Sequence, residues 1–240
     1  GQYGFLALWD NFYFAHGPIG GYGGYVFKDN GGKLDPADIG LNNEGAVEGM
    51  DYIGKWYKEG LFPKGLIGGG GGQALDQLFG DKKAVAVMNG PWAVASYKEK
   101  GINLGASALP KLPNGEPIKT FVGVKTYAIS AYSENAEWAE KFLASLTGEE
   151  NAKTMFEKYN EIPPVTALQE DATIKDNEVA AAVFAQAKNG VPMPNIAEMG
   201  QVWEPMAAAL QLVATNKQDA QKSADDAVKQ IKQQIEANNQ

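Results

Sequence analysis

Short apolar segments alternate with amphipathic ones over the first 130 residues, and this alternation constrains the fold most. The segments that predict strands lie at residues 3–8, 25–27, 84–88, 104–109 and 126–130, with those at 3–8 and 84–88 expected to be buried. Between them, apolar residues recur at helical spacing, as at Ala46, Met50, Ile53 and Tyr57, and the last third is nearly all helical. Strands that alternate with helices predict an α/β fold with a partly parallel sheet.

Capping residues mark where several of these helices begin and end. Asn11 and Asn43 precede helical segments and can accept a hydrogen bond from the first turn. Gly60 lies just past the helix that follows Asn43, at the position where a residue with left-handed backbone commonly ends a helix. Pro91 suits the first position of a helix. Ser133 is the predicted cap of a later helix, which begins just after Ser133.

The charged residues and the missing cysteine exclude several classes of function. The chain has 240 residues, no cysteine, one histidine and no arginine, and its net charge is −8. Cysteine clusters and multi-histidine metal sites are therefore excluded, and neither a metal nor a cofactor is predicted. A chain of this charge repels the phosphate backbone of nucleic acid, so nucleic acid is not a predicted partner.

A run of five glycines at residues 68–72 is the most unusual local feature. A phosphate-binding loop needs lysine and then serine or threonine after its last glycine, but here Gln73, Ala74 and Leu75 follow. The run is therefore not predicted to bind phosphate. A flexible linker or an engineered loop is the favoured interpretation.

The histidine and the acidic residues offer weaker signals of catalysis. His16 lies among aromatic residues before a Gly-Pro turn, which favours a partly buried, hydrogen-bonded side chain. Asp10 follows a predicted strand, where α/β proteins often bind ligands, and Glu198 and Glu204 flank Trp203. A pair of carboxylates could serve a glycosidase, although no pair stands out from the sequence.

Aromatic residues at loop–helix junctions are the most informative class of candidate. Tyr13 and Phe14 follow a strand end, Trp92 follows Asn-Gly-Pro, and Trp203 follows a proline-containing loop. Flat apolar rings with polar neighbours suit the faces of sugar rings, whose hydroxyl groups bond to the neighbouring side chains. With no arginine present, a neutral polyhydroxyl ligand fits better than a phosphorylated one.

Several segments carry a resemblance to one family. They are GGYVFK at 23–28, NGPWA at 89–93, FVGV at 121–124, MPNI at 193–196 and the single residue Trp203. In this order they resemble the maltose/maltodextrin-binding proteins, the extracytoplasmic receptors of ABC sugar importers. The resemblance covers nearly the whole chain but only the later part of a family member.

The resemblance implies an α/β fold of the type II periplasmic-binding-protein class, in which two lobes close around a linear α-1,4-glucan. Residues 1–121 and 176–240 would then belong to the second lobe, and residues 122–175 to a mostly missing first lobe. Phe121, Val122 and Gly123 match the hinge. A helix in the 122–175 segment that carries Trp138 and Phe142 would lack most of its partners, because about 140 residues ahead of Gly1 are expected to be absent or on another chain.

The resemblance also implies a non-enzymatic function, the reversible binding of maltodextrin-type oligosaccharides for delivery to an ABC-importer permease. Tyr13 and Trp203 would be stacking platforms and Trp92 a further aromatic wall. The remaining ligand-binding residues implied are Phe14 and Met193, which would line the groove, and Asn11, which would make a polar contact. The glycine run falls where relatives have a loop on the ligand side, and its residues have no side chain that could contact a sugar.

Partners and location follow from the same resemblance. The expected partners are a maltooligosaccharide, the membrane permease, and either a complementary first-lobe chain or a second copy. The expected location is extracytoplasmic, on a cell-surface lipoprotein or in the periplasm, with the leader absent from a chain that begins Gly1-Gln2-Tyr3. Two alternatives stay open: a carbohydrate-active hydrolase that uses Asp10 or Glu204, and an engineered fragment or biosensor scaffold.

Overall fold

The computed structural model describes residues 1–238, which form two compact units. Among the described residues, the larger unit consists of 1–88, 109–122 and 189–238, and the smaller unit of 89–108 and 123–188. The chain therefore passes from one unit to the other at 88–89, 108–109, 122–123 and 188–189. Whether either unit corresponds to a lobe of a binding protein stays a prediction.

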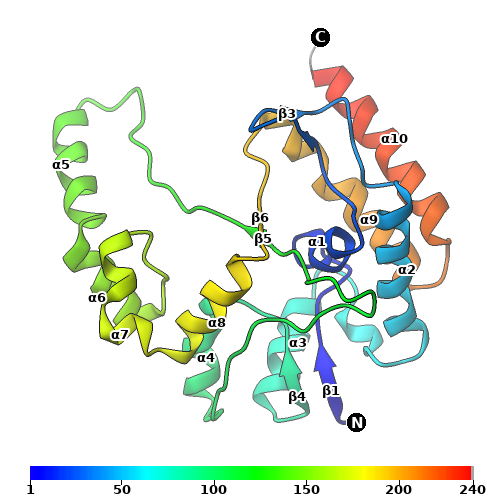
Figure 1. Cartoon of the computed structure of the whole chain (residues 1–240), viewed down its shortest axis with the longest axis horizontal. Coiled ribbons are helices and arrows are strands. Elements are labelled where there is room, and N and C mark those ends of the chain that lie inside the picture. The colour runs from blue at the N-terminus through cyan, green and yellow to red at the C-terminus, as the bar shows by residue number, and fades with distance from the viewer. Residues whose placement is uncertain (239–240) are drawn as a thin grey trace. The chain divides into compact units, whose positions relative to one another are not determined.

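Four helices form the body of the larger unit, and short strand pairs lie around them (Figure 1). The helices are α1 (Phe12–Gly21), α2 (Glu44–Lys58), α9 (Trp203–Ala214) and α10 (Ala220–Asn238), joined by α3 (Gly71–Gly80) and the 3-10 turns η1 (Lys64–Leu66) and η4 (Ala197–Gln201). Helix α2 packs against α1 and α9, and α10 packs against α9 and α2. Helices α2, α9 and α10 each bury one apolar face, whereas eight of the ten residues of α1 are buried.

The strands of the larger unit confirm the predicted α/β class with parallel pairing. Strand β1 (Tyr3–Leu6) runs parallel to β4 (Ala84–Val87), and β5 (Phe121–Val122) runs parallel to β6 (Val191–Pro192). Strands β2 (Lys28–Asp29) and β3 (Leu34–Asp35) form an antiparallel pair. The pairing of β5 with β6 joins two segments that lie far apart in the sequence, and this pairing positions the candidate site described below.

The smaller unit is helical. It contains η2 (Pro91–Ala93), α4 (Val94–Glu99), α5 (Ala136–Leu146), α6 (Glu149–Tyr159), η3 (Thr166–Glu170), α7 (Ala172–Lys175) and α8 (Glu178–Ala187). Its core is small and is made by Phe156, Leu168, Ile174 and Ala180. Helix α5 has no buried residue, so its apolar side chains remain at the surface of the described chain.

Most predicted helix ends are confirmed by hydrogen bonds. The Asn11 and Asn43 side chains accept from the backbone N–H groups of Tyr13 and Ala46, at 3.0 and 2.7 Å. Gly60 has a φ of +71°, as a residue that ends a helix requires. The predicted cap at Ser133 is wrong, because α5 begins after Asn135; the Ser133 hydroxyl accepts from the Asn135 N–H instead.

Several predicted strands are wrong for a common reason. Residues 104–109 and 126–130 form no strand, and residues 25–27 make only an isolated bridge from Tyr25 to Gly40. A strand is defined by a ladder with a neighbour, and no such neighbour lies beside these segments among residues 1–238. Strand β4 forms but is not buried, because only β1 pairs with it there and Val85 is left 83% exposed.

The glycine run is ordered, contrary to the prediction of a flexible linker. Gly68 adopts a φ of +90°, and its N–H donates to the Asp10 carboxylate at 2.6 Å. Gly70 precedes α3, and Gly71 is the first residue of that helix. A Cβ atom on Gly71 would lie 2.2 Å from the Leu66 carbonyl oxygen, so this close approach of two backbone segments requires glycine.

We expect Gly71→Ala to lower the free energy of unfolding by about 1–3 kcal/mol, the usual cost of forcing extra atoms into packed structure. A Cβ on Gly69 meets no atom within 4 Å, so Gly69→Ala is the matched control and should leave stability nearly unchanged. Urea unfolding of both variants measures the difference. Equal stability of the two variants would contradict the ordered loop.

Candidate ligand-binding site

An aromatic cluster surrounds Phe121 in the larger unit. Its members are Phe12, Tyr13, His16, Phe121 and Trp203. The centroid of the Phe121 ring lies 5.9 Å from that of Phe12, 6.2 Å from Tyr13, 3.8 Å from His16 and 6.1 Å from Trp203. The structure therefore brings together Tyr13 and Trp203, the two predicted stacking platforms, with a residue of the predicted hinge.

Three separate elements bring these rings together. Tyr13 and Phe12 open α1, whose start is fixed by the Asn11 cap, and Trp203 opens α9. Phe121 lies in β5, opposite Val191 of β6. The Tyr13 and Trp203 rings are half-buried, whereas the Phe12 and Phe121 rings next to them are buried.

Of two further predicted residues, Phe14 lies next to Tyr13 of the cluster, and Met193 is bonded to Val122, the residue after Phe121. The Phe14 ring meets that of Tyr13 edge-on, with centroids 5.3 Å apart. The Met193 N–H donates to the Val122 carbonyl at 3.1 Å, which continues the β5–β6 pairing. Both side chains are half-buried. Asn11 is exposed at the start of α1, with its side-chain oxygen occupied by the cap.

The other predicted residues, Trp92 and Gly123, belong to the smaller unit. Trp92 lies in η2 and is 54% exposed, and its indole covers Gly90 so closely that a Cβ there would lie 2.2 Å from the ring. The boundary between the two units falls between Val122 and Gly123, inside the predicted hinge. The roles of all these residues as ligand contacts or hinge stay predictions.

The sequence analysis did not assign two members of the cluster, Phe12 and His16, to the site, and of these only His16 is titratable. The side chain is 2% exposed, and its Nδ1 lies 2.9 Å from the Lys119 carbonyl oxygen. A carbonyl only accepts, so Nδ1 carries the proton of the neutral imidazole. Burial lowers the pKa of His16 to about 4, against the raising effect of the Lys119 carbonyl. The predicted hydrogen bond is confirmed, but the side chain is fully buried rather than partly buried, and Gly17 and Pro18 continue α1 instead of forming a turn.

We expect His16 to make the protein less stable as the pH falls from about 7 to about 4. The unfolded imidazole binds a proton near pH 6.5, whereas the folded one stays neutral until about pH 4. The unfolded state therefore binds more protons in this interval, and the free energy of unfolding falls by up to about 3 kcal/mol. Urea unfolding of wild type and His16→Phe across this range isolates the effect; a stability difference that does not change with pH would contradict it.

The acidic residues named for a hydrolase, Asp10 and Glu204, lie in different surroundings. Asp10 is buried, and its carboxylate accepts from the Gly68 N–H. Burial raises the pKa of Asp10, and backbone hydrogen bonds oppose that rise. Glu204 is exposed in the first turn of α9, so Asp10 is best explained as the anchor of the glycine run.

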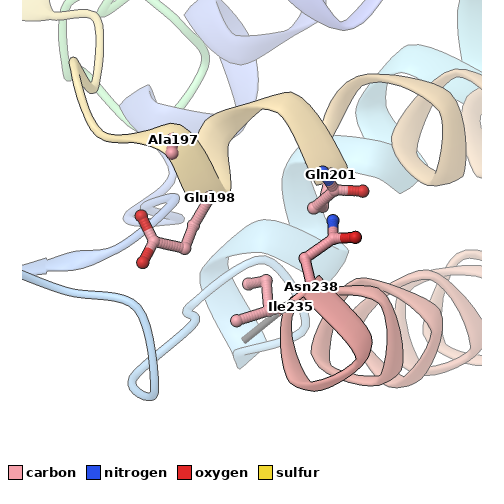
Figure 2. Close-up of a pocket in the computed structure, with 5 residues that line it drawn as sticks. All are labelled: Ala197, Glu198, Gln201, Ile235 and Asn238. Atoms are coloured by element: carbon pink, nitrogen blue, oxygen red, sulfur yellow. The ribbon is translucent and has the colours of Figure 1, made fainter. Parts of the chain in front are cut away.

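A small pocket lies elsewhere in the larger unit, between η4 and α10 (Figure 2). Its volume is about 130 Å³, and it is lined by Ala197, Glu198, Gln201, Ile235 and Asn238. None of the predicted ligand-binding residues lines it. The described residues contain no cluster of metal-ligating side chains, and no helix among them has the length and apolar character needed to cross a bilayer.

Several known proteins are similar to this chain in sequence or in fold. The galactooligosaccharide-binding protein of Bacillus subtilis (strain 168) is 46% identical over 98% of this chain and 56% of its own length. The maltodextrin-binding protein MdxE of the same organism is 42% identical over 97% of this chain and 55% of its own length. A crystal structure of a cyclo/maltodextrin-binding protein with maltotetraose has a TM-score of 0.85 and 40% identity, over 98% of this chain and 60% of that one.

These similarities confirm the resemblance to maltodextrin-binding proteins and the α/β periplasmic-binding-protein fold expected from it. The chain spans about half the length of the curated relatives it matches. The family model described as bacterial extracellular solute-binding protein matches residues 1–182, which is most of the chain. The chain therefore belongs to the family of bacterial extracellular solute-binding proteins.

Proposed function

We propose that this chain is part of a receptor that binds a maltodextrin-type oligosaccharide reversibly and delivers it to the permease of an ABC importer. The observation that carries the proposal is the pair of half-buried rings, Tyr13 and Trp203, supported from beneath by the buried ring of Phe121. Rings held in this way present a rigid apolar face at low entropic cost, which suits the face of a pyranose.

The polar residues and the net charge favour a neutral ligand. The chain has no arginine and a net charge of −8, so nothing in it favours a phosphorylated sugar over a neutral one. The Asn11 oxygen is already bonded to the Tyr13 N–H, which leaves the Asn11 amide NH₂ as the group that donates to a sugar hydroxyl. Phe14, Met193 and Trp92 are proposed as further apolar contacts.

The hinge, the partners and the location belong to the same proposal. Phe121, Val122 and Gly123 are proposed as the hinge, and the unit boundary after Val122 supports this assignment. Delivery requires an extracytoplasmic location, on a cell-surface lipoprotein or in the periplasm, and the description of the family as extracellular supports it. Binding without catalysis is proposed because the relatives are named as binding proteins.

A galactooligosaccharide is the second candidate ligand. It is favoured by the relative of that name, which is 46% identical to this chain. Both ligands are neutral chains of hexoses, so the same stacking rings could serve either, and the choice depends on hydrogen bonds to individual hydroxyl groups.

Calorimetric titration of maltotriose and of a galactooligosaccharide, into protein that contains both lobes, tests the proposal. We expect saturable binding of one of them and no release of reducing ends from a maltooligosaccharide during long incubation. Failure of both sugars to bind would refute the proposed function. Steady release of reducing ends that is lost in Asp10→Asn or Glu204→Gln would instead support the hydrolase.

A further inference from the structure

His16 links α1 to the strand that carries Phe121. The backbone of Lys119 is bonded twice to consecutive residues of α1, because its N–H donates to the Gly17 carbonyl at 3.0 Å and its carbonyl accepts from His16 Nδ1. Two residues further along, the Phe121 ring stacks on the imidazole at 3.8 Å with an angle of 19° between the planes. The His16 imidazole thus holds both the Lys119 backbone, which precedes β5, and the Phe121 ring at the start of β5.

Glycines on α1 allow this segment to lie so close to the helix. A Cβ on Gly17 would lie 2.7 Å from the Ile118 side chain, and a Cβ on Gly20 would lie 3.3 Å from Cβ of Lys119. The same Gly20 atom would lie 3.2 Å from Cε1 of His16. A side chain at either position would meet these atoms, so glycine at 17 and 20 is what lets the segment before β5 and the imidazole lie against α1.

The surroundings of the imidazole require its neutral form. Phe12 of α1 meets it edge-on at 5.9 Å and Phe121 of β5 covers its face, so two of its neighbours are apolar rings. The Trp203 ring of α9 contacts both of these rings. Helix α2 packs against α1 near Ile19, where a Cβ on Gly49 would lie 2.7 Å from the Ile19 backbone. The charged group that acts on His16 is the Lys119 ammonium, which disfavours a second positive charge.

We propose that His16 is a positioning residue for the sugar-binding rings. It makes no sugar contact itself, but it fixes Phe121, against which Tyr13 and Trp203 rest. The proposal rests on the proposed function, because those two rings are its stacking platforms. Loss of the imidazole frees Phe121 to move, and the platforms then lose their preorganised orientation.

The test compares oligosaccharide affinity in three variants of protein that contains both lobes. His16→Ala removes the stack and the hydrogen bond, and we expect about a tenfold loss of affinity per folded molecule. His16→Phe keeps a stacked ring without the donor and should recover part of the loss. Ile53→Val, in the buried core of α2, lowers stability but should leave affinity unchanged. His16→Ala affinity within about twofold of wild type would overturn the proposal.

The pH profile supplies a readout that a merely structural role would not move. His16 is the single histidine, so its imidazole NMR signals are unambiguous. We expect the affinity of folded wild type to fall at the pH where these signals titrate, and His16→Phe to lack that fall. Titration of the imidazole with no change in affinity would overturn the positioning role.

A second spectroscopic measurement separates failure of this proposal from failure of the proposed function. If wild type binds neither sugar, the proposed function fails, but the indole N–H signal of Trp203, assigned with Trp203→Phe, still reports ring position. A shifted or broadened Trp203 signal in His16→Ala, absent in Ile53→Val, supports positioning by His16. An unchanged signal overturns it.

Discussion

We expect replacement of Trp203 with alanine to lower the affinity for maltotriose or a longer maltodextrin about thirtyfold, in protein that contains both lobes. This corresponds to about 2 kcal/mol, the usual cost of truncating a dominant aromatic contact. The ring is half-buried and rests on Phe12 and Phe121, with centroids 6.0 and 6.1 Å away, so it is held in place before the ligand arrives. Calorimetric titration of both proteins measures the loss.

Trp138→Ala is the matched control for this prediction. The Trp138 ring lies on α5 in the smaller unit, is 71% exposed, and has the Lys141 ammonium 4.9 Å from its centroid. Its removal should leave affinity per folded molecule nearly unchanged. Equal affinity of Trp203→Ala and wild type would refute the platform. A steep loss of binding at high salt would refute a neutral ligand, because uncharged groups are not screened.

We expect the 240-residue chain on its own to associate through α5, and the double variant Trp138→Ser/Phe142→Ser to stay monomeric. The two rings lie four residues apart on one face of α5 and are 71% and 63% exposed. Covering a large aromatic side chain is worth about 1.5–3 kcal/mol, so a second copy gains most by burying this face. The exposure agrees with the expectation that this helix lacks most of its partners.

Sedimentation over a range of concentrations measures this association. Leu61→Ser removes another exposed apolar side chain, in the larger unit, and should leave the association unchanged. A wild-type chain that remains monomeric at every concentration would refute the prediction.

Local chemistry made several elements predictable from the sequence. Asn11 and Asn43 cap helices, Gly60 ends one, and Pro91 opens a short helical turn, because each of these roles depends on one residue and its immediate backbone. The family resemblance also came from the sequence, since its segments are contiguous and occur in a fixed order.

The sequence also named Tyr13 and Trp203 as candidate site residues, because rings at loop–helix junctions are visible in a linear pattern. It did not show that the two rings share Phe121 as a support, nor that His16 stacks on that ring at 3.8 Å. That cluster draws on α1, β5 and α9, and contacts among such distant segments exist only once the chain is folded.

Only the tertiary structure decides whether the predicted strands form and which conformation the glycine run adopts. Residues 104–109 and 126–130 have the composition of strands, but a strand needs a neighbouring strand to complete its hydrogen-bond ladder. Local composition does not show whether such a neighbour is present. Gly71 was predicted to lie in a flexible linker, yet it begins a helix against the Leu66 carbonyl. Periodicity and caps are local and could be predicted, whereas strand pairing, close backbone approach and the support of the aromatic rings depend on which distant segments meet.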